Sequence, residues 1–518
     1  MEIVFLILLL MAFAVNFTML CLYYLHMFQL NSYKPHEQLK WLKGNFLPAV
    51  VGRNLGAIVT IPLLLFCGPI GQGISFLVLA ISAYLNRPKK AKKPLVYTNR
   101  IKRMLITLGV LLCFIVAAAA LLGQSWGNGL LLPIAQFFAS LLVLLANLIN
   151  RPIEQSINNW YINDAKQMIR EMSDLKVIGI TGSYGKTSVK FYLNKLLSAK
   201  YNVLMTPESF NTTLGVVRTI RSSLKATHEI FICEMGAKNI GDIQEICDIV
   251  KPNYGIITSI GPQHLESFKS IDNVIKTKFE LADAVPQDGI VFLNNDNEYI
   301  RKQKRSKKTV AYGIEETDSD YRAYDIQVSS KGSSFKMTVD GTDYTFLTRL
   351  IGAHNVLNIA GAIAAAHTLG VPMTDLVRQV KALESVPHRL QLIKGSQALI
   401  IDDAYNSNPS GAKAALDTLS AFEGFKILVT PGMIELGEKQ DECNHTFGTQ
   451  AASVCDYVVL VGERQTKSIY NGLTDAKYEP NKIIVAPNLQ EALKSVENIK
   501  TGGLQKIVLL ENDLPDNY

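Results

Sequence analysis

The chain has 518 residues, enough for about three domains of ~150 residues each. Hydrophobic residues make up 48% of it and the mean hydropathy is +0.15, which is high for a wholly soluble enzyme. The net charge of +7 is modest and gives no reason to expect a nucleic-acid partner. The seven cysteines form no CxxC pair and no metal-like cluster, which argues against a disulfide framework or a zinc site.

The apolar excess is concentrated in the first 150 residues, where five stretches each have close to the ~20 residues that cross a bilayer. These stretches are 3–25, 46–67, 69–86, 104–123 and 130–150. Arg53 lies within the second one, and a charge inside a span points to a functional site. An arginine only two turns from the end of a span can also reach the lipid headgroups, so both interpretations stay open.

The charges of the connecting loops predict the orientation. The turns 68–73 and 124–129 carry no charge, whereas 34–43 is mainly basic. Residues 87–103 contain no acid and eight basic residues: Arg87, Lys89, Lys90, Lys92, Lys93, Arg100, Lys102 and Arg103. Because basic loops stay on the cytoplasmic side, we expect a multi-pass protein of the inner (plasma) membrane. Its N-terminus is predicted outside, and everything after Arg151 in the cytoplasm.

Residues 179–187 read Gly-Ile-Thr-Gly-Ser-Tyr-Gly-Lys-Thr and indicate a phosphate-binding turn. An apolar strand pattern precedes the turn and a helical pattern follows it, so its backbone N–H groups would meet a phosphate at a helix N-terminus. Lys186 would reach the outer phosphates and Thr187 would hold magnesium. The upstream glycines lie three and six residues before Gly185, unlike the standard P-loop, and a chance surface turn is the alternative.

From residue 176 the pattern alternates between strands and helices, which predicts βαβ units and largely parallel sheets. Strands are expected at 176–181, 202–206, 230–234, 254–259, 289–294 and 309–312. A hairpin with a Gly-Thr-Asp turn is expected over 323–350, and an Ala-rich helix over 353–369. Further strands at 398–402, 426–430, 457–461, 482–486 and 506–510 predict a smaller, doubly wound domain.

The predicted organisation is therefore a transmembrane helical domain over 1–150 and a juxtamembrane helix over 151–175. An α/β nucleotide-binding domain over 176–385 and a Rossmann-like domain over 386–518 follow them.

The string GITGSYGKTSVK resembles the ATP-binding turn of the Mur ligases, the amide-forming enzymes of peptidoglycan precursor assembly. Further blocks follow in that family's order: ESFNTTLG (208–215), CEMGAKNIGDI (233–243), SIGPQHLESFKS (259–270), TKFELADAV (277–285), FLNNDNE (292–298), IGAHNVLNIAGA (351–362), VPHRLQ (386–391), IDDAYNSNPSGAKAAL (401–416) and GMIELGE (432–438). The last two blocks are similar to the MurF type, which joins D-alanyl-D-alanine to a UDP-muramoyl-tripeptide.

The resemblance covers residues 176–510 and does not extend beyond either end of this range. The MurF type begins with a soluble domain that holds the UDP end of its substrate, where this chain has apolar stretches. That type also carries a Lys-Gly-Ser-Arg-like segment after its last strand, whereas this chain continues Glu511-Asn512-Asp513-Leu514-Pro515-Asp516. Both differences concern the substrate and leave the ATP chemistry intact.

The resemblance implies that ATP phosphorylates a carboxylate and that an amine attacks the resulting acyl phosphate, with Mg²⁺ as cofactor. It assigns catalytic roles to Lys186, Lys278, His264 and Arg389. It places ATP at Gly182, Ser183, Tyr184, Gly185, Lys186, Thr187, Ser188, Asn294, His354, Asn355, Arg389 and Asp402. Magnesium falls to Thr187, Glu234, His264 and a carbamylated Lys278, and the substrates fall to Asn211, Thr212, Tyr405, Asn406 and Asn408.

Three of these assignments have simple structural alternatives. His264, taken without its sequence block, could be a capping or core histidine. Lys278 could be a surface lysine of an amphipathic helix beside Lys276, and the Asn-Ser-Asn-Pro segment of 406–409 is also a good turn.

The sequence favours an ATP-dependent carboxylate–amine ligase that acts on a cell-envelope precursor, with an amino acid or dipeptide as amine donor. Five spans in place of a UDP-binding domain suggest an acceptor held at the membrane, with lipid as a partner. The alternatives are a MurF-type ligase on the UDP-linked peptide, a ligase similar to those of poly-γ-glutamate capsule synthesis, and a non-catalytic nucleotide-binding transporter or scaffold.

Overall fold

The computed structural model describes residues 2–88, 93–208, 210–263, 265–303, 307–329, 331–395, 398–405, 407–434 and 436–513. Lys89, Lys90 and Lys92 of the predicted basic loop lie outside these ranges, as do the candidate site residues His264 and Asn406. The chain divides into two units, Met1–Trp160 with Pro515–Tyr518, and Tyr161–Leu514. Each unit is described by itself.

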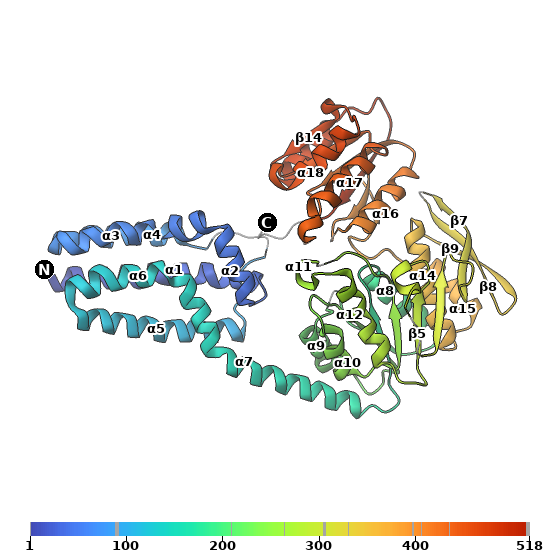
Figure 1. The fold of residues 1–518 in the computed structure, drawn as a ribbon, viewed down its shortest axis with the longest axis horizontal. Helices are drawn as coiled ribbons and strands as arrows, with labels where there is room; N and C mark the ends of the chain where they lie inside the picture. Colours follow the sequence, from blue (N-terminus) through green and yellow to red (C-terminus); the bar gives the residue numbers. More distant parts are fainter. Residues whose placement is uncertain are drawn as a thin grey trace. The chain divides into compact units, whose positions relative to one another are not determined.

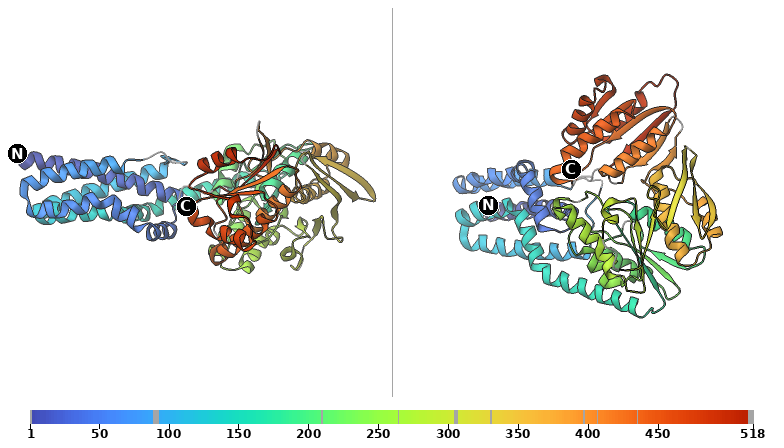
Figure 2. Two further views of the ribbon diagram at one scale, coloured as in Figure 1. Left: turned by 90° about the horizontal axis from the view of Figure 1, so that it is seen from above. Right: turned by 45° about the vertical axis from the view of Figure 1, so that its right-hand side comes forward.

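The first unit is a bundle of helices that lie side by side (Figures 1 and 2). Its elements are α1 (Glu2–Leu30), α2 (Pro35–Gly44), the π-helical η1 (Phe46–Val51), the 3-10 turn η2 (Gly52–Asn54), α3 (Leu55–Phe66), α4 (Gly68–Asn86), α5 (Asn99–Gly123), the π-helical η3 (Gln124–Leu131), α6 (Leu132–Phe137) and α7 (Ala139–Arg170). Apolar side chains cover the outside as well as the interior of this bundle: Ile3, Phe66, Phe114 and Leu121 are all at least 69% exposed.

Among the described residues, four helices are long and apolar enough to cross a membrane, or up to five if a bent pair forms one span. The four are Ile3–Leu30, Phe46–Phe66, Gly68–Asn86 and Asn99–Gly123, close to the first four predicted stretches. The fifth stretch differs, because its helix bends by 71° between Phe137 and Ala139. Beyond the bend, α7 continues to Arg170 with Pro152 inside it, so the fifth stretch and the juxtamembrane helix are one element.

The second unit begins with a nine-stranded sheet in the order β2-β3-β1-β4-β5-β6-β7-β8-β9. Its strands are β1 (Lys176–Thr181), β2 (Val203–Met205), β3 (Ile230–Glu234), β4 (Tyr254–Ile257), β5 (Ile290–Asn294), β6 (Thr309–Gly313), β7 (Tyr321–Ser329), β8 (Gly332–Val339) and β9 (Thr342–Thr348). All pairings from β2 to β7 are parallel, and β7-β8 and β8-β9 are antiparallel. The predicted hairpin is thus a three-stranded meander, with the Gly-Thr-Asp turn between its last two strands.

Helices cover both faces of the parallel strands, as a doubly wound sheet requires. Successive residues of β1 show this, because Val177 belongs to one apolar core and Ile178 to the other. The Ile178 core is closed by α8 (Lys186–Leu197), α14 (Ala353–Thr368) and α15 (Met373–Lys381). The Val177 core is closed by α9 (Thr213–Ser223), α10 (Asp242–Val250) and α12 (Ile271–Ala284), drawn in green in Figure 1. The short helices α11 (Leu265–Phe268) and α13 (Glu298–Arg301) lie in loops.

The second sheet of this unit has six strands in the order β10-β11-β15-β12-β13-β14. These are β10 (Gln391–Lys394), β11 (Ala398–Asp403), β12 (Phe425–Thr430), β13 (Tyr457–Val461), β14 (Ile483–Ala486) and β15 (Lys506–Glu511). Its helices are α16 (Pro409–Ser420), α17 (Gln440–Ala452), α18 (Glu463–Asp475) and α19 (Leu489–Asn498), with short turns η4 (Gly437–Lys439) and η5 (Pro480–Lys482). The strand β10, which pairs antiparallel with β11, is an addition to the five predicted strands.

Candidate functional site

The turn between β1 and α8 has the shape of a phosphate loop. Gly185 has a φ of 80°, a left-handed conformation that favours glycine. A Cβ on Gly182 would lie 2.2 Å from the Thr258 hydroxyl, and one on Gly185 would lie 2.7 Å from Asn358 Oδ1. A larger residue at either glycine would therefore collide with a close neighbour, although the spacing of the two glycines differs from the standard motif.

The loop is held from outside by the segment that follows β4. Ser183 donates its N–H to Ser259 O (2.6 Å), and Tyr184 donates its N–H to Ser259 Oγ (3.1 Å). The Tyr184 hydroxyl reaches Pro262 O at 2.6 Å. The SIGPQHLESFKS block therefore belongs to the same site as the glycine-rich turn, because its residues hold the turn at the N-terminus of α8.

Lys186 is folded back onto this loop, where its Nζ donates to Gly182 O (2.8 Å) and Ser183 O (3.1 Å). Burial lowers the pKa of Lys186 to about 8, with Glu234 acting in the opposite direction and Arg389 adding to the decrease. The charge lies beside the N-terminus of α8, where anions bind. The position suits a lysine that binds phosphate.

Glu234, the last residue of β3, is the centre of a buried polar cluster. Its Oε1 accepts hydrogen bonds from Thr187 Oγ1 (3.1 Å) and Asn211 Nδ2 (2.9 Å). Its Oε2 lies 3.0 Å from Lys190 Nζ, without a well-directed hydrogen bond among the described residues. Burial alone would raise the pKa of Glu234, but the charges of Lys190 and Lys186 outweigh it and hold the pKa below its usual value. The carboxylate is thus ionised at neutral pH.

The donor set fits magnesium better than a transition metal. The Thr187 hydroxyl and the Glu234 carboxylate are hard oxygen ligands, which Mg²⁺ prefers. The described residues contain no group of three or more histidine, cysteine, aspartate or glutamate side chains that could hold a metal ion. Any further ligands must come from elsewhere in this site, and Lys278 is a candidate in the predicted set.

Lys278 lies on α12 and is only 1% exposed, so it is not the surface lysine of the simpler interpretation. Burial holds its pKa well below the usual value, with Lys186 adding to the decrease and Asp242 and Glu280 opposing it. No hydrogen bond or ion pair of Lys278 occurs within the described ranges. A buried, neutral amine is the form that reacts with carbon dioxide to give a carbamate.

Two of the residues predicted to bind ATP, Asn294 and Asn355, have side chains that are engaged within the protein. Asn294 donates to Thr258 O (2.7 Å) and accepts from the Asp296 N–H (3.1 Å). Asn355 accepts from the Tyr192 hydroxyl (2.7 Å) and donates to Ile351 O (2.8 Å). These amides position the loops around a nucleotide site, and their contact with a nucleotide stays a prediction. Burial lowers the pKa of His354 to about 4, so this ring is neutral.

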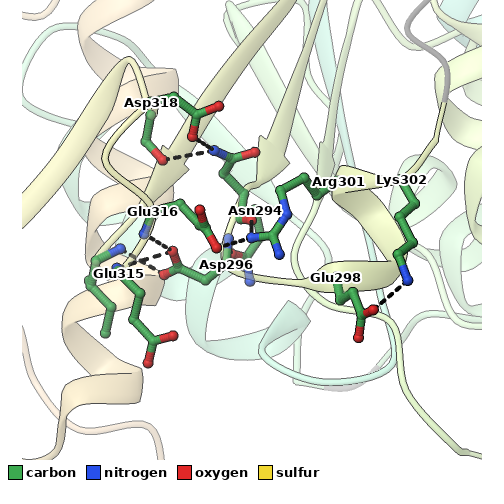
Figure 3. Close-up of polar contacts among 11 residues, drawn as sticks. Asn294, Asp296, Glu298, Arg301, Lys302, Glu315, Glu316 and Asp318 are labelled. Atoms are coloured by element: carbon green, nitrogen blue, oxygen red, sulfur yellow. Dashed lines mark hydrogen bonds and ion pairs between the residues drawn. The ribbon is translucent and has the colours of Figure 1, made fainter.

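Figure 3 shows how the loop after β5 is fixed at the carboxyl edge of the sheet. Asp296 accepts N–H groups from Ile314, Glu315 and Glu316 at 2.7, 3.1 and 2.9 Å. Arg301 in turn pairs with Glu316. The loops that follow β5 and β6 are thereby joined, and ligands of parallel sheets bind at this edge.

The predicted substrate residues show mixed surroundings. Thr212 and Asn408 cap helices α9 and α16, with their side chains accepting from Gly215 N (3.4 Å) and Gly411 N (2.8 Å). Asn211 instead contacts the Glu234 carboxylate. Tyr405 is 47% exposed, and its ring lies 4.4 Å from the Arg389 guanidinium carbon.

Asp402 is buried and accepts from its own loop at Ala404 N (3.1 Å), and its Oδ2 lies 2.8 Å from His388 Nδ1. The next residue, Asp403, faces Glu511 across the β11–β15 pairing. Burial raises the pKa of Asp403 to about 6. Burial and the neighbouring charge of Asp403 hold the pKa of Glu511 well above its usual value.

Sequence reasoning missed Lys190 and Asn358. Lys190 follows Lys186 by one helical turn, and this i, i+4 spacing could have placed it on the same face of α8. Asn358 lies one turn after His354 and approaches Gly185, a contact that only the packing of α14 against the loop reveals.

Comparison with known proteins agrees with this geometry. The Mur ligase middle domain matches residues 180–366, and the Mur ligase glutamate ligase domain matches residues 388–510. The UDP-N-acetylmuramoyl-tripeptide–D-alanyl-D-alanine ligase of Buchnera aphidicola (subsp. Acyrthosiphon pisum) is 30% identical over 337 residues, 63% of this chain and 72% of that one. The chain belongs to the Mur ligase family.

Two further relatives define the extent of the similarity. The ligase of the same name from Bacillus subtilis (strain 168) is 34% identical over 287 residues, which are 55% of this chain and 62% of that one. The MurF ligase of Thermotoga maritima in complex with ADP superposes with a TM-score of 0.61 at 27% identity, covering 69% of this chain and 80% of that one. The chain thus spans about three fifths of the Bacillus relative.

Proposed function

We propose that the chain is an ATP- and magnesium-dependent ligase of the MurF type, which joins an amine to the carboxylate of a peptidoglycan precursor. The observation that carries the proposal is the convergence of Thr187, Lys190 and Asn211 on the buried Glu234, one turn from the phosphate loop. A scaffold that had lost catalysis would have no reason to keep these buried charges, because burying them is costly.

The residues act mainly by position and charge, as phosphoryl transfer requires. The phosphate loop and Lys186 bind and orient ATP, and Arg389, whose charge acts on Lys186, adds positive charge at the same place. The acceptor carboxylate attacks the γ-phosphorus, which gives an acyl phosphate and ADP. The amine then attacks the acyl carbon, so an amide forms, inorganic phosphate leaves and the amine gives up a proton.

Magnesium, held by Thr187 and Glu234, would neutralise the negative charge that builds up between the phosphates. A carbamate on Lys278 would supply a second anionic oxygen group on α12. The lowered pKa and burial of Lys278 support this modification, since they favour the uncharged amine and shield the product from water. His264 completes the predicted set and lies outside the described residues.

For the substrates we propose a dipeptide amine such as D-alanyl-D-alanine and a muramoyl-tripeptide carboxylate, as in the names of the relatives. Asn211, Thr212, Tyr405 and the segment around Asn408 are the proposed contacts. The first of the two family matches begins at residue 180, after the apolar helices, so neither match includes these helices. We therefore propose that the acceptor is held at the membrane, as a lipid-linked glycan or peptide.

The first 150 residues are the proposed membrane domain. We propose five spans, counting the bent pair as one, with the basic loops in the cytoplasm. This arrangement would put the N-terminus outside and the catalytic unit in the cytoplasm, where ATP is available. The exposed apolar side chains of the bundle support this placement, because a soluble bundle would bury them.

The test uses the full chain in lipid nanodiscs with ATP, magnesium and D-alanyl-D-alanine. Either UDP-muramoyl-tripeptide or its lipid-linked counterpart serves as acceptor. We expect phosphate release only when acceptor and amine are both present, with product mass equal to the two substrates less one water. Faster turnover of the lipid-linked acceptor would support the membrane proposal. Phosphate release without amide formation, or none with either acceptor, would refute the ligase.

A further inference from the structure

The start of the second predicted span is irregular in a way that needs help from its neighbours. The π-helical η1 is followed directly by the 3-10 turn η2, which carries Arg53. Such breaks in a helix often occur at functional sites. The Tyr24 hydroxyl donates to Ala49 O (2.8 Å), and Asn86 Nδ2 donates to Arg53 O (3.0 Å). Side chains from α1 and α4 thus donate hydrogen bonds to backbone oxygens of the irregular segment that carries the arginine.

The Arg53 guanidinium is fixed on two sides. Its Nη1 donates to Asn86 Oδ1 at 3.3 Å, and its carbon lies 3.5 Å from the centre of the Tyr23 ring. Asn86 is held in turn by Asn16, whose Oδ1 lies 3.2 Å from Asn86 Nδ2, and by Ser82 Oγ at 3.3 Å. Asn16 and Asn86 are 0% and 4% exposed, so the arginine rests on a buried polar support.

This fixed cation has no anionic partner among the residues that the structure describes. The first 160 residues contain three acidic residues, Glu2, Glu37 and Glu154. Glu154 binds Arg103 through both oxygens (2.6 and 2.9 Å), and Glu37 lies 3.3 Å from His36. Within the described residues no carboxylate pairs with Arg53, and its Nε and Nη2 make no hydrogen bond. The planar guanidinium group of an arginine can donate two parallel hydrogen bonds to two oxygens of a phosphate.

The arginine lies at the depth of lipid phosphates if the bundle spans a membrane. Helix α4 has 19 residues. At ~1.5 Å per residue it is about 28 Å long, close to the ~30 Å of a hydrocarbon core. Asn86 is its last residue and contacts Arg53, so both lie at the end predicted to be cytoplasmic. The Tyr23 and Trp41 rings, 6.1 Å apart, are typical of the same interface.

We propose that Arg53, fixed by Asn86 and Tyr23, binds the phosphate of an anionic membrane lipid at the cytoplasmic end of the bundle. The inference rests on the membrane placement under the proposed function, and it is independent of the ligase chemistry. An arginine that only extended to the bulk headgroups would need no buried pair of asparagines to fix its orientation. The site gives the membrane domain a ligand of its own, in the cytoplasmic leaflet.

The test is native mass spectrometry of the full chain in neutral detergent, with phosphatidylcholine, phosphatidylglycerol or a polyprenyl monophosphate added. We expect one retained equivalent of an anionic lipid, bound at least about tenfold more tightly than phosphatidylcholine. The tighter of the two anionic lipids identifies the occupant. Displacement by inorganic phosphate at the same concentration as the lipid would overturn the assignment to a lipid.

Three variants make the result specific. Arg53→Gln should lose the preference for anionic lipid. Asn86→Asp should lose it too, because the new carboxylate pairs with Arg53 while the cation is kept. Arg87→Gln is the matched control, since Arg87 is exposed, lies next to Asn86 and also covers a tyrosine ring, at 4.1 Å from Tyr84. The proposal fails if Arg53→Gln binds as the wild type does, or if Arg87→Gln weakens binding equally.

The result of the lipid-binding test can be judged separately from the result of the ligation test. Extraction of the wild-type chain from cells without detergent would refute the membrane placement itself. Ligation is measured on the wild type alone, so a negative lipid result leaves the ligase assignment as it stands.

Discussion

Lys190 Nζ lies 3.0 Å from Glu234 Oε2, and both side chains are completely buried beneath the phosphate loop. Lys190 also donates to Glu208 O, in the segment that leads to Asn211. The lysine therefore links the proposed magnesium carboxylate to the loop proposed to meet the acceptor.

Replacing Lys190 by methionine should lower the free energy of unfolding of the second unit by about 3–5 kcal/mol, since one buried charge loses its partner. It should also raise the pKa of Glu234, because burial then acts with less opposition. Magnesium-dependent turnover should consequently fail at a higher pH than in the wild type as the pH is lowered. Denaturant unfolding and a pH–rate profile measure the two effects. Lys195→Met, on the exposed face of the same helix, is the control.

Lys186→Ala should reduce ATP turnover by a factor of about 10² or more, because we propose that the side chain binds phosphate. The fold should be kept, since Lys186 belongs to neither apolar core of the sheet. If this variant turned over ATP at the wild-type rate, the loop would not be the ATP-binding site.

The pKa of Lys186 gives a separate prediction about pH. With a pKa of about 8, the amine is charged below pH 8 and loses its charge as the pH rises through that value. Affinity for ADP should thus decrease between pH 7 and pH 9, with proton uptake on binding at the higher pH. Calorimetry in buffers of different ionisation enthalpy measures both quantities. An affinity that stays constant over this range would contradict the lowered pKa.

Lys278→Ala should lose activity and regain part of it with added formate or acetate, because a small carboxylate can occupy the space of the carbamate. Lys278→Arg should not be rescued, since it retains the wrong charge and fills the space. Lys276→Ala, an exposed neighbour on the same helix, should be unaffected. Near-normal turnover of Lys278→Arg would exclude the carbamate, and ¹³C NMR after labelling with ¹³CO₂ detects it directly.

Cys67, which is exposed and lies between α3 and α4, should react with a membrane-impermeant maleimide added to intact cells. A cysteine introduced at Gly44, where a Cβ meets nothing within 4 Å, should react only after the membrane is permeabilised. Cys67→Ser gives the background. The opposite pattern would place the catalytic unit outside the cell, away from ATP.

The raised pKa values of Asp403 and Glu511 predict a stability that depends on pH. Both carboxyls keep a proton in the folded state at a pH where the unfolded chain has lost it. Stability of the second unit should therefore decrease as the pH rises from about 4, the usual carboxyl pKa, through about 6. Glu511→Gln should flatten this dependence in thermal unfolding, whereas Glu423→Gln, at an exposed carboxyl, should leave it unchanged.

Regular elements with strong local patterns were predictable from the sequence. The strands at 176–181, 230–234 and 457–461 agree with β1, β3 and β13 to the residue, because each is a short apolar run between turns. The strand β10 and the meander β7–β9 were not fully predictable, since they are half exposed and their pairing depends on distant partners. The four long apolar helices were predictable from hydropathy, but the 71° bend was not, because no single residue marks its position.

The candidate site shows the same division. Lys186, Thr187 and Glu234 lie together as the motif predicts. The burial of Lys190 and Lys278 depends on how α8 and α12 pack, which no local pattern contains. For Asn355, the sequence could not tell a ligand contact from its hydrogen bond with Tyr192, 163 residues away.

Asn211 and Thr187 share one oxygen of Glu234, and Gly236 N donates to Asn211 O at 2.7 Å. An ion that takes this oxygen must therefore displace or reorient the asparagine at the head of α9. We expect that magnesium–nucleotide entry rearranges the loop before the acceptor can bind productively, which makes the kinetic mechanism ordered. Nucleotide would be the leading substrate, and an acceptor analogue would inhibit competitively with acceptor and uncompetitively with ATP.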